Sequence, residues 1–93
     1  MFVHSLYVHM HLQSTSLKGK RGIVKSILAR VRQRFNVSAI EADLQDVPGE
    51  TVLAFALIHQ TRSGGRNLLE RVEEWIAEER PDVEIVASEI EER

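Results

Sequence analysis

The chain of 93 residues contains 12 basic and 14 acidic side chains, so its formal net charge is -2, and hydrophobic residues make up 43% of it. This length suffices for one domain with one modest core and is too short for two. No cysteine is present, which excludes a disulfide framework, thiolate metal sites and thiol catalysis, and is compatible with a reducing cytoplasm. We therefore expect one cytoplasmic globular domain over residues 1–93.

The first twelve residues do not predict a membrane segment. They are partly apolar, but they lack a basic n-region and contain three histidines, so we do not expect a signal peptide. No apolar run approaches the length that spans a bilayer. The sequence predicts no membrane partner.

Residues 2–12 alternate between apolar and polar side chains, which predicts a strand. The apolar face carries Phe2, Leu6, Val8, Met10 and Leu12, and the other face carries Ser5, Tyr7, His9 and His11. His4 falls on the face opposite His9 and His11 by the same alternation. Two imidazoles are too few for a zinc site, and the sequence does not set the register of His59 against this strand. We expect surface or dimer-buried imidazoles and no metal or other cofactor.

The stretch from Ser14 to Phe35 predicts a basic amphipathic helix, with Ser16 as its N-cap and Asn36 as its C-cap. Its apolar residues recur at helical spacing and are expected to face the core. They are Ile23, Val24, Ile27, Leu28, Val31 and Phe35.

Two further strands are expected after this helix. Val37–Leu44 is rich in acidic residues, which favours a place at the edge of a sheet. Val47-Pro48-Gly49-Glu50 is a turn signal. Thr51–Gln60 is almost entirely apolar, which indicates a central strand covered on both faces. Since two helices cover only one face of so small a sheet, a second copy of the chain is the expected cover for the other.

The last third of the chain predicts a loop at residues 61–66, a second helix and a final strand that begins at Val83. The complete order is strand, helix, strand, strand, helix, strand. With right-handed crossovers, this order predicts an α+β fold, the ferredoxin-like βαββαβ sandwich with a four-stranded antiparallel sheet and both helices on one face.

The charges are divided unequally along the chain. Residues 1–40 hold seven basic residues and no acidic one, whereas the remainder holds five arginines and all 14 acids. This asymmetry suits a nucleic acid or another acidic partner, and it equally suits two halves that face each other in the fold or across a dimer. Cations in the first turn of a helix are disfavoured by its dipole, so free N–H groups beside them suggest an anion site. The candidate binding residues are Lys18, Lys20, Arg21, Lys25 and Arg32, and no residue is identified as catalytic.

Three stretches match a known pattern: Ser16-Leu17-Lys18-Gly19-Lys20-Arg21, Arg34-Phe35-Asn36-Val37-Ser38 and Glu41-Ala42-Asp43-Leu44-Gln45-Asp46. Through them the chain resembles the YlxP-like family of small bacterial proteins of unknown function, over essentially its whole length. The resemblance implies a ferredoxin-like fold and a cytoplasmic bacterial protein whose relatives are often encoded among genes for translation and ribosome maturation. It implies no established activity.

Three hypotheses of function follow from these observations. The first is a non-enzymatic protein that binds RNA or a ribosomal particle through phosphate contacts of the five candidate residues. The alternative is a homodimeric module that recognises a protein partner without nucleic acid. The third is an enzyme similar to acylphosphatase, with a substrate phosphate at residues 14–21, and it rests on fold analogy alone.

Overall fold

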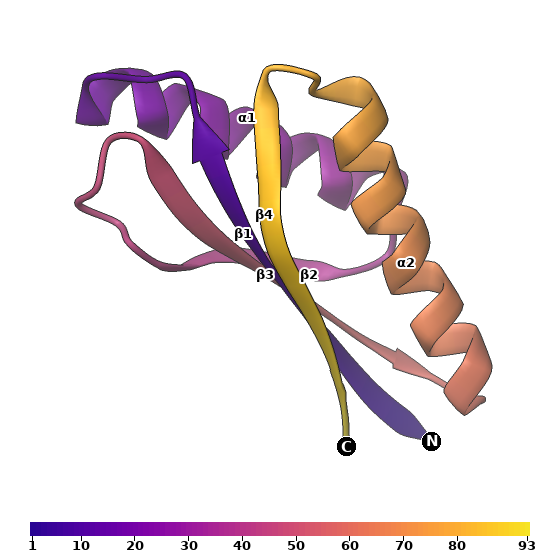
Figure 1. Ribbon diagram of the computed structural model, residues 1–93. Coiled ribbons are helices and arrows are strands. Elements are labelled where there is room, and N and C mark those ends of the chain that lie inside the picture. Colours follow the sequence, from indigo (N-terminus) through magenta and orange to yellow (C-terminus); the bar gives the residue numbers. More distant parts are fainter.

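The computed structural model describes residues 1–93. Its elements are β1 (Phe2–Leu12), α1 (Leu17–Arg34), β2 (Ser38–Asp43), β3 (Glu50–His59), α2 (Arg62–Glu79) and β4 (Val83–Glu92). The strands form one antiparallel sheet in the order β2-β3-β1-β4, and both helices lie on the same side of it (Figure 1). The predicted ferredoxin-like α+β fold is confirmed, with β1 and β3 in the centre of the sheet.

The hydrophobic core lies between the two helices and one face of the sheet. The predicted alternation in β1 is correct, because Leu6, Val8 and Met10 are fully buried on this face and His4 is buried beside them. The core consists of Leu6, Val8, Met10, Leu12, Val24, Ile27, Leu28, Val31, Phe35, Ala39, Leu53, Phe55, Leu57, Leu69, Val72 and Ile76. Neither helix is long and apolar enough to cross a membrane.

The two helices begin at opposite ends of the sheet. In the pairing of β1 with β3, Phe2 lies opposite His59 and His11 lies opposite Glu50. Because α1 follows the end of β1 and α2 follows the end of β3, their N-termini are separated by the length of the strands (Figure 1). The chain ends meet beside the start of α2, where the backbones of Val3 and Arg93 exchange two hydrogen bonds of 3.0 and 2.7 Å.

The predicted ends of α1 are correct at the N-cap and wrong at the C-cap. Ser16 has extended backbone angles, and its hydroxyl accepts a hydrogen bond of 3.1 Å from the N–H of Gly19, as expected of an N-cap. The C-cap is Phe35 and not Asn36. Burial of the Phe35 ring in the core, edge-on to Trp75 at 6.3 Å between centroids, explains why the chain leaves the helix there.

The prediction of a loop at residues 61–66 is wrong, because α2 already begins at Arg62. Thr61 is its N-cap, and the Thr61 hydroxyl accepts a hydrogen bond of 3.1 Å from the N–H of Gly64. The two glycines that suggested a loop instead let this turn approach the sheet closely. A Cβ atom on Gly65 would lie 2.3 Å from Nδ1 of His4, and one on Gly64 would lie 2.2 Å from Cε1 of His59.

The central strand β3 is covered by the chain on one face only. Its helix-facing residues Leu53 and Phe55 are fully buried. On the opposite face Ala54 and Ala56 are half-buried, and Ile58 is 67% exposed. The predicted central position is therefore confirmed, whereas the predicted cover on the second face is not supplied by this chain.

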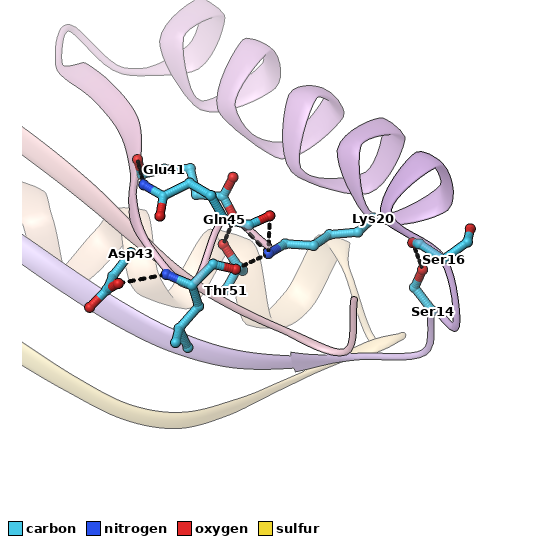
Figure 2. Close-up of polar contacts among 8 residues, drawn as sticks. Ser14, Ser16, Lys20, Glu41, Asp43, Gln45 and Thr51 are labelled. Carbon is cyan, nitrogen blue, oxygen red and sulfur yellow. Dashed lines mark hydrogen bonds and ion pairs between the residues drawn. The ribbon is translucent and has the colours of Figure 1, made fainter. Parts of the chain in front are cut away.

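A buried ion pair joins the first turns of α1 to the sheet. The side chain of Lys20 is 1% exposed, and its Nζ lies 3.0 Å from Oε2 of Glu41 in β2. Figure 2 shows this side chain extending from the helix towards the segment after β2, where Nζ donates hydrogen bonds to the carbonyl oxygens of Leu44 and Gln45. Glu41 also accepts a hydrogen bond of 2.6 Å from the buried hydroxyl of Thr51 in β3. The network thus connects α1, β2, β3 and the loop between the two strands.

The loop is held in a conformation that leucine rarely adopts. Leu44 has a φ of 62°, in the left-handed region that disfavours residues with a Cβ atom. Its N–H is bonded to Oδ1 of Asp43 at 2.7 Å, and its carbonyl accepts hydrogen bonds from Lys20 Nζ and from the N–H of Val47. Lys20 therefore compensates a strained turn as well as a partly buried carboxylate.

Replacement of Lys20 by methionine is expected to destabilise the fold. Lys20→Met keeps most of the apolar volume but leaves Glu41 without its counter-charge and removes one donor from each of two carbonyl groups, so the free energy of unfolding should fall by about 3 kcal/mol in urea denaturation. The control is Lys18→Met, which also removes one positive charge, but from an exposed side chain that has no acidic partner. Equal stability of the two variants would contradict a structural role for Lys20.

Candidate nucleic-acid interface

Three of the five predicted binding residues form an uncompensated basic row on α1. Lys18, Arg21 and Lys25 are all exposed and follow one another at spacings of three and four residues, which places them along one side of the helix. None of the three lies within 4.0 Å of a carboxylate. We refer to these three residues as the basic row.

The fourth residue, Arg32, extends this row towards the edge of the sheet. Its guanidinium donates a hydrogen bond to the carbonyl oxygen of Ala39 in β2, which fixes its direction and leaves further donors free. A shallow groove of about 390 Å³ runs between α1 and β2. Its lining consists of Arg21, Val24, Lys25, Leu28, Ala29, Arg32 and Glu41. The only acid among them is Glu41, whose charge is already balanced by Lys20.

The prediction that Lys20 belongs to the anion-binding group is wrong. Its ammonium group is enclosed by Glu41 and the two loop carbonyls, so it has no donor directed to solvent (Figure 2). The spacing of apolar residues in the sequence could have indicated that Lys20 is buried. Lys20 precedes Val24 by four residues and Ile27 by seven, which continues the buried stripe of the helix by one turn towards its N-terminus.

Three of the five remaining cations of the helices pair with acids within the fold, whereas Arg34 and Arg71 have no ion-pair partner. Arg30 lies 4.0 Å from Glu79 of α2 and its guanidinium stands over Trp75, so this flank of α1 is used to pack the helices together. Arg62 pairs with Glu92, and Arg66 pairs with Glu70 at 3.3 Å. These two arginines belong to the start of α2, at the other end of the sheet. They do not extend the basic row, contrary to the suggestion that the loop at residues 61–66 contributes to it.

The open face of the sheet, which the helices do not cover, carries exposed apolar side chains. Ile40 in β2 and Ile58 in β3 are 60% and 67% exposed. Between β1 and β2 this face has a shallow hollow of about 250 Å³. The hollow is lined by Ser5, Tyr7, Ser38, Ala39, Ile40, Ala54, Phe55 and Ala56. Among the lining residues, Tyr7 is the aromatic one that faces away from the core. The hollow therefore offers one aromatic ring on which a base could stack.

At one end of the open face, Glu50 joins the two histidines that the sequence placed together. Nε2 of His9 lies 2.9 Å from Oε1 of Glu50, and Nε2 of His11 lies 3.3 Å from the same oxygen. The hydrogen bond from His9 is the main cause of the lowered pKa of Glu50. His59 is not part of this group, because it faces the helices and its Nδ1 accepts a hydrogen bond from the N–H of Thr61. Sequence reasoning missed Glu50, since the register of β1 against β3 was unknown.

Comparison with known proteins places the chain among proteins without an assigned function. A curated relative, "Uncharacterized protein YlxP" of Bacillus subtilis (strain 168), is 40% identical over 57 residues, which cover 61% of this chain and 62% of the relative. That match therefore spans less than two thirds of the relative's length. A solved structure, "De novo designed protein Foldit4", is similar with a TM-score of 0.47 and 18% identity, over 98% of this chain and 96% of that one.

The family resemblance inferred from the three sequence stretches is confirmed, and the match extends well beyond those stretches. A family model described as "Protein of unknown function (DUF503)" matches residues 3–90, which is nearly the whole chain. The structure explains part of the resemblance, because the stretch around Lys20 and the stretch around Glu41 are the two sides of the buried ion pair. The chain belongs to the DUF503 family of proteins of unknown function.

Proposed function

We propose that this protein is a non-enzymatic RNA-binding protein that associates with ribosomal particles in the cytoplasm. The basic row and Arg32 contact phosphate groups along the groove between α1 and β2. The single observation that carries this proposal is the lack of any acidic partner for Lys18, Arg21 and Lys25, although the chain has 14 acidic residues. Five arginines elsewhere do lie beside acids: Arg30, Arg62, Arg66, Arg80 and Arg93.

The chemistry of the groove favours phosphates over base edges. Lysine and arginine side chains on one helix flank match the repeated negative charge of a nucleic-acid backbone. The guanidinium groups of Arg21 and Arg32 suit bidentate contacts with phosphate oxygens. Val24, Leu28 and Ala29 form the floor of the groove and offer no hydrogen-bonding side chain to a base. We therefore expect binding that depends on charge and shape more than on sequence.

Removal of the basic row is expected to weaken RNA binding and to reduce its salt dependence. In the triple variant Lys18→Ala, Arg21→Ala, Lys25→Ala, three phosphate contacts are lost. The slope of log K against log salt should therefore become smaller by about 2 for a single strand. Co-sedimentation with ribosomal particles and fluorescence anisotropy with a labelled ribosomal RNA fragment, both across a salt series, measure the effect. Lys20 is left intact in this design, because its replacement would disturb the fold.

The matched control is Arg62→Ala, Arg66→Ala, Arg71→Ala, which removes the same charge from exposed positions of α2. This control is expected to retain most of the affinity and nearly the whole salt slope. If both triple variants lose binding equally, the interaction depends on net charge and not on the basic row. If native protein does not associate at low salt, the proposed function is wrong.

The open face supports a second candidate, a homodimeric interaction module that binds a protein partner without nucleic acid. The observation in its favour is that Ile40 and Ile58 are exposed to solvent on the open face, where the hollow also lies. Apolar side chains that cluster on one face are typical of a surface that another chain covers. Dimerisation through this face would leave α1 accessible, because the helices lie on the other side of the sheet (Figure 1).

Sedimentation velocity over a range of protein concentrations tests the dimer. The native chain is expected to sediment as a dimer, and Ile58→Glu as a monomer, because a carboxylate on the contact face must be desolvated. Gln60→Glu introduces the same charge at an exposed position just after β3 and is expected to remain dimeric. A native chain that stays monomeric at all concentrations would remove the support for this candidate.

A further inference from the structure

We propose that His9, His11 and Glu50 form a zinc-binding site on the open face of the sheet. This site is separate from the basic row, which lies on α1 on the other side of the sheet. Zinc binding can therefore be tested independently of the proposed RNA binding.

The backbone brings the three side chains together without any rearrangement. His9 and His11 are two residues apart in β1, so they project from the same face. Glu50 is the first residue of β3 and lies directly opposite His11 in the strand pairing. One ring nitrogen of each imidazole and a carboxylate oxygen of Glu50 all lie within 4.8 Å of one another. Two strands in the centre of the sheet thus hold three metal-binding groups at fixed positions.

The two distances from Glu50 to the histidines are close to those between ligands of a tetrahedral ion. Zinc binds imidazole nitrogen and carboxylate oxygen at roughly 2.0–2.2 Å, so two ligand atoms of one tetrahedral ion are about 3.4 Å apart. Oε1 of Glu50 lies 2.9 Å from Nε2 of His9 and 3.3 Å from Nε2 of His11. Small rotations of the three side chains would make room for the ion, which then replaces the direct contacts among them. Two histidines and one glutamate are also a common set of protein ligands for zinc.

None of the residues paired with the two histidines across the sheet carries a positive charge. Across the two neighbouring strands, His9 lies opposite Val52 and Ala87, and His11 lies opposite Glu50 and Glu84. Glu84 adds a negative charge next to the site without being one of the three grouped ligands.

The competing interpretation is a cluster held only by hydrogen bonds between the histidines and Glu50. Metal-free protein titrated with Zn²⁺ in calorimetry separates the two. We expect one equivalent to bind, and Co²⁺ in its place to give the visible absorption bands of a tetrahedral ion. His9→Gln, His11→Gln and Glu50→Gln should each weaken binding by more than about tenfold, since loss of even an outer partner of a metal ligand costs that much.

The matched control is Glu89→Gln, which removes an exposed carboxylate of β4 opposite Tyr7, on the same face as the three ligands. Its affinity for Zn²⁺ should equal that of the native chain. In the native protein, NMR signals of the His9 and His11 imidazoles should shift on addition of Zn²⁺, while those of the buried His4 stay in place. Absence of saturable binding, retention of affinity in the three ligand variants, or shifts confined to His59 would each overturn the site.

Discussion

The ion pair between Lys20 and Glu41 ties the first turns of α1 to β2, on the side of the helix that also buries its apolar residues. Successive residues of a helix are rotated by about 100°. With Lys20 directed into the interface, Lys18, Arg21 and Lys25 must therefore face outward. The same pair fixes the loop after β2, because the Lys20 ammonium also binds the carbonyl of Leu44, whose backbone is strained. One buried lysine thereby positions both the cations of the candidate interface and the groove edge beside them.

The unequal distribution of charge along the sequence has two separate explanations in the structure. Part of it is internal, since Lys20 and Arg30 from the basic half meet Glu41 and Glu79 from the acidic half. The other part is a surface property, because the basic row has no acidic neighbour. The interpretation as internal pairing is therefore confirmed for Lys20 and Arg30, and the interpretation as a surface for an acidic partner stays a prediction. The Lys20–Glu41 pair joins α1 to the sheet, the Arg30–Glu79 pair lies between the two helices, and the basic row has no ion-pair partner.

Much of the fold could be predicted because β1 alternates cleanly and β3 is nearly all apolar, which identified both central strands. The position of Ser16 as N-cap followed from local chemistry alone.

Three features could not be predicted from the sequence, because they depend on contacts between distant segments. Lys20 has a buried acidic partner 21 residues away, the glycines at the start of α2 accommodate two histidines of the sheet, and Glu50 meets His9 and His11 only through strand pairing. Of the five predicted binding residues, the structure brings Arg21, Lys25 and Arg32 to one groove, keeps Lys18 exposed beside them and buries Lys20.

The most direct test of the functional account is to map where RNA contacts the native protein. Two-dimensional ¹H–¹⁵N NMR spectra, recorded during titration with a short ribosomal RNA fragment at low salt, report on every backbone amide at once. If the basic row binds RNA, shifts should be concentrated in the first three turns of α1, around Lys18, Arg21 and Lys25, and in the adjacent edge of β2. Shifts confined to the open face around Ile40 and Ile58, or no shifts at all, would contradict it.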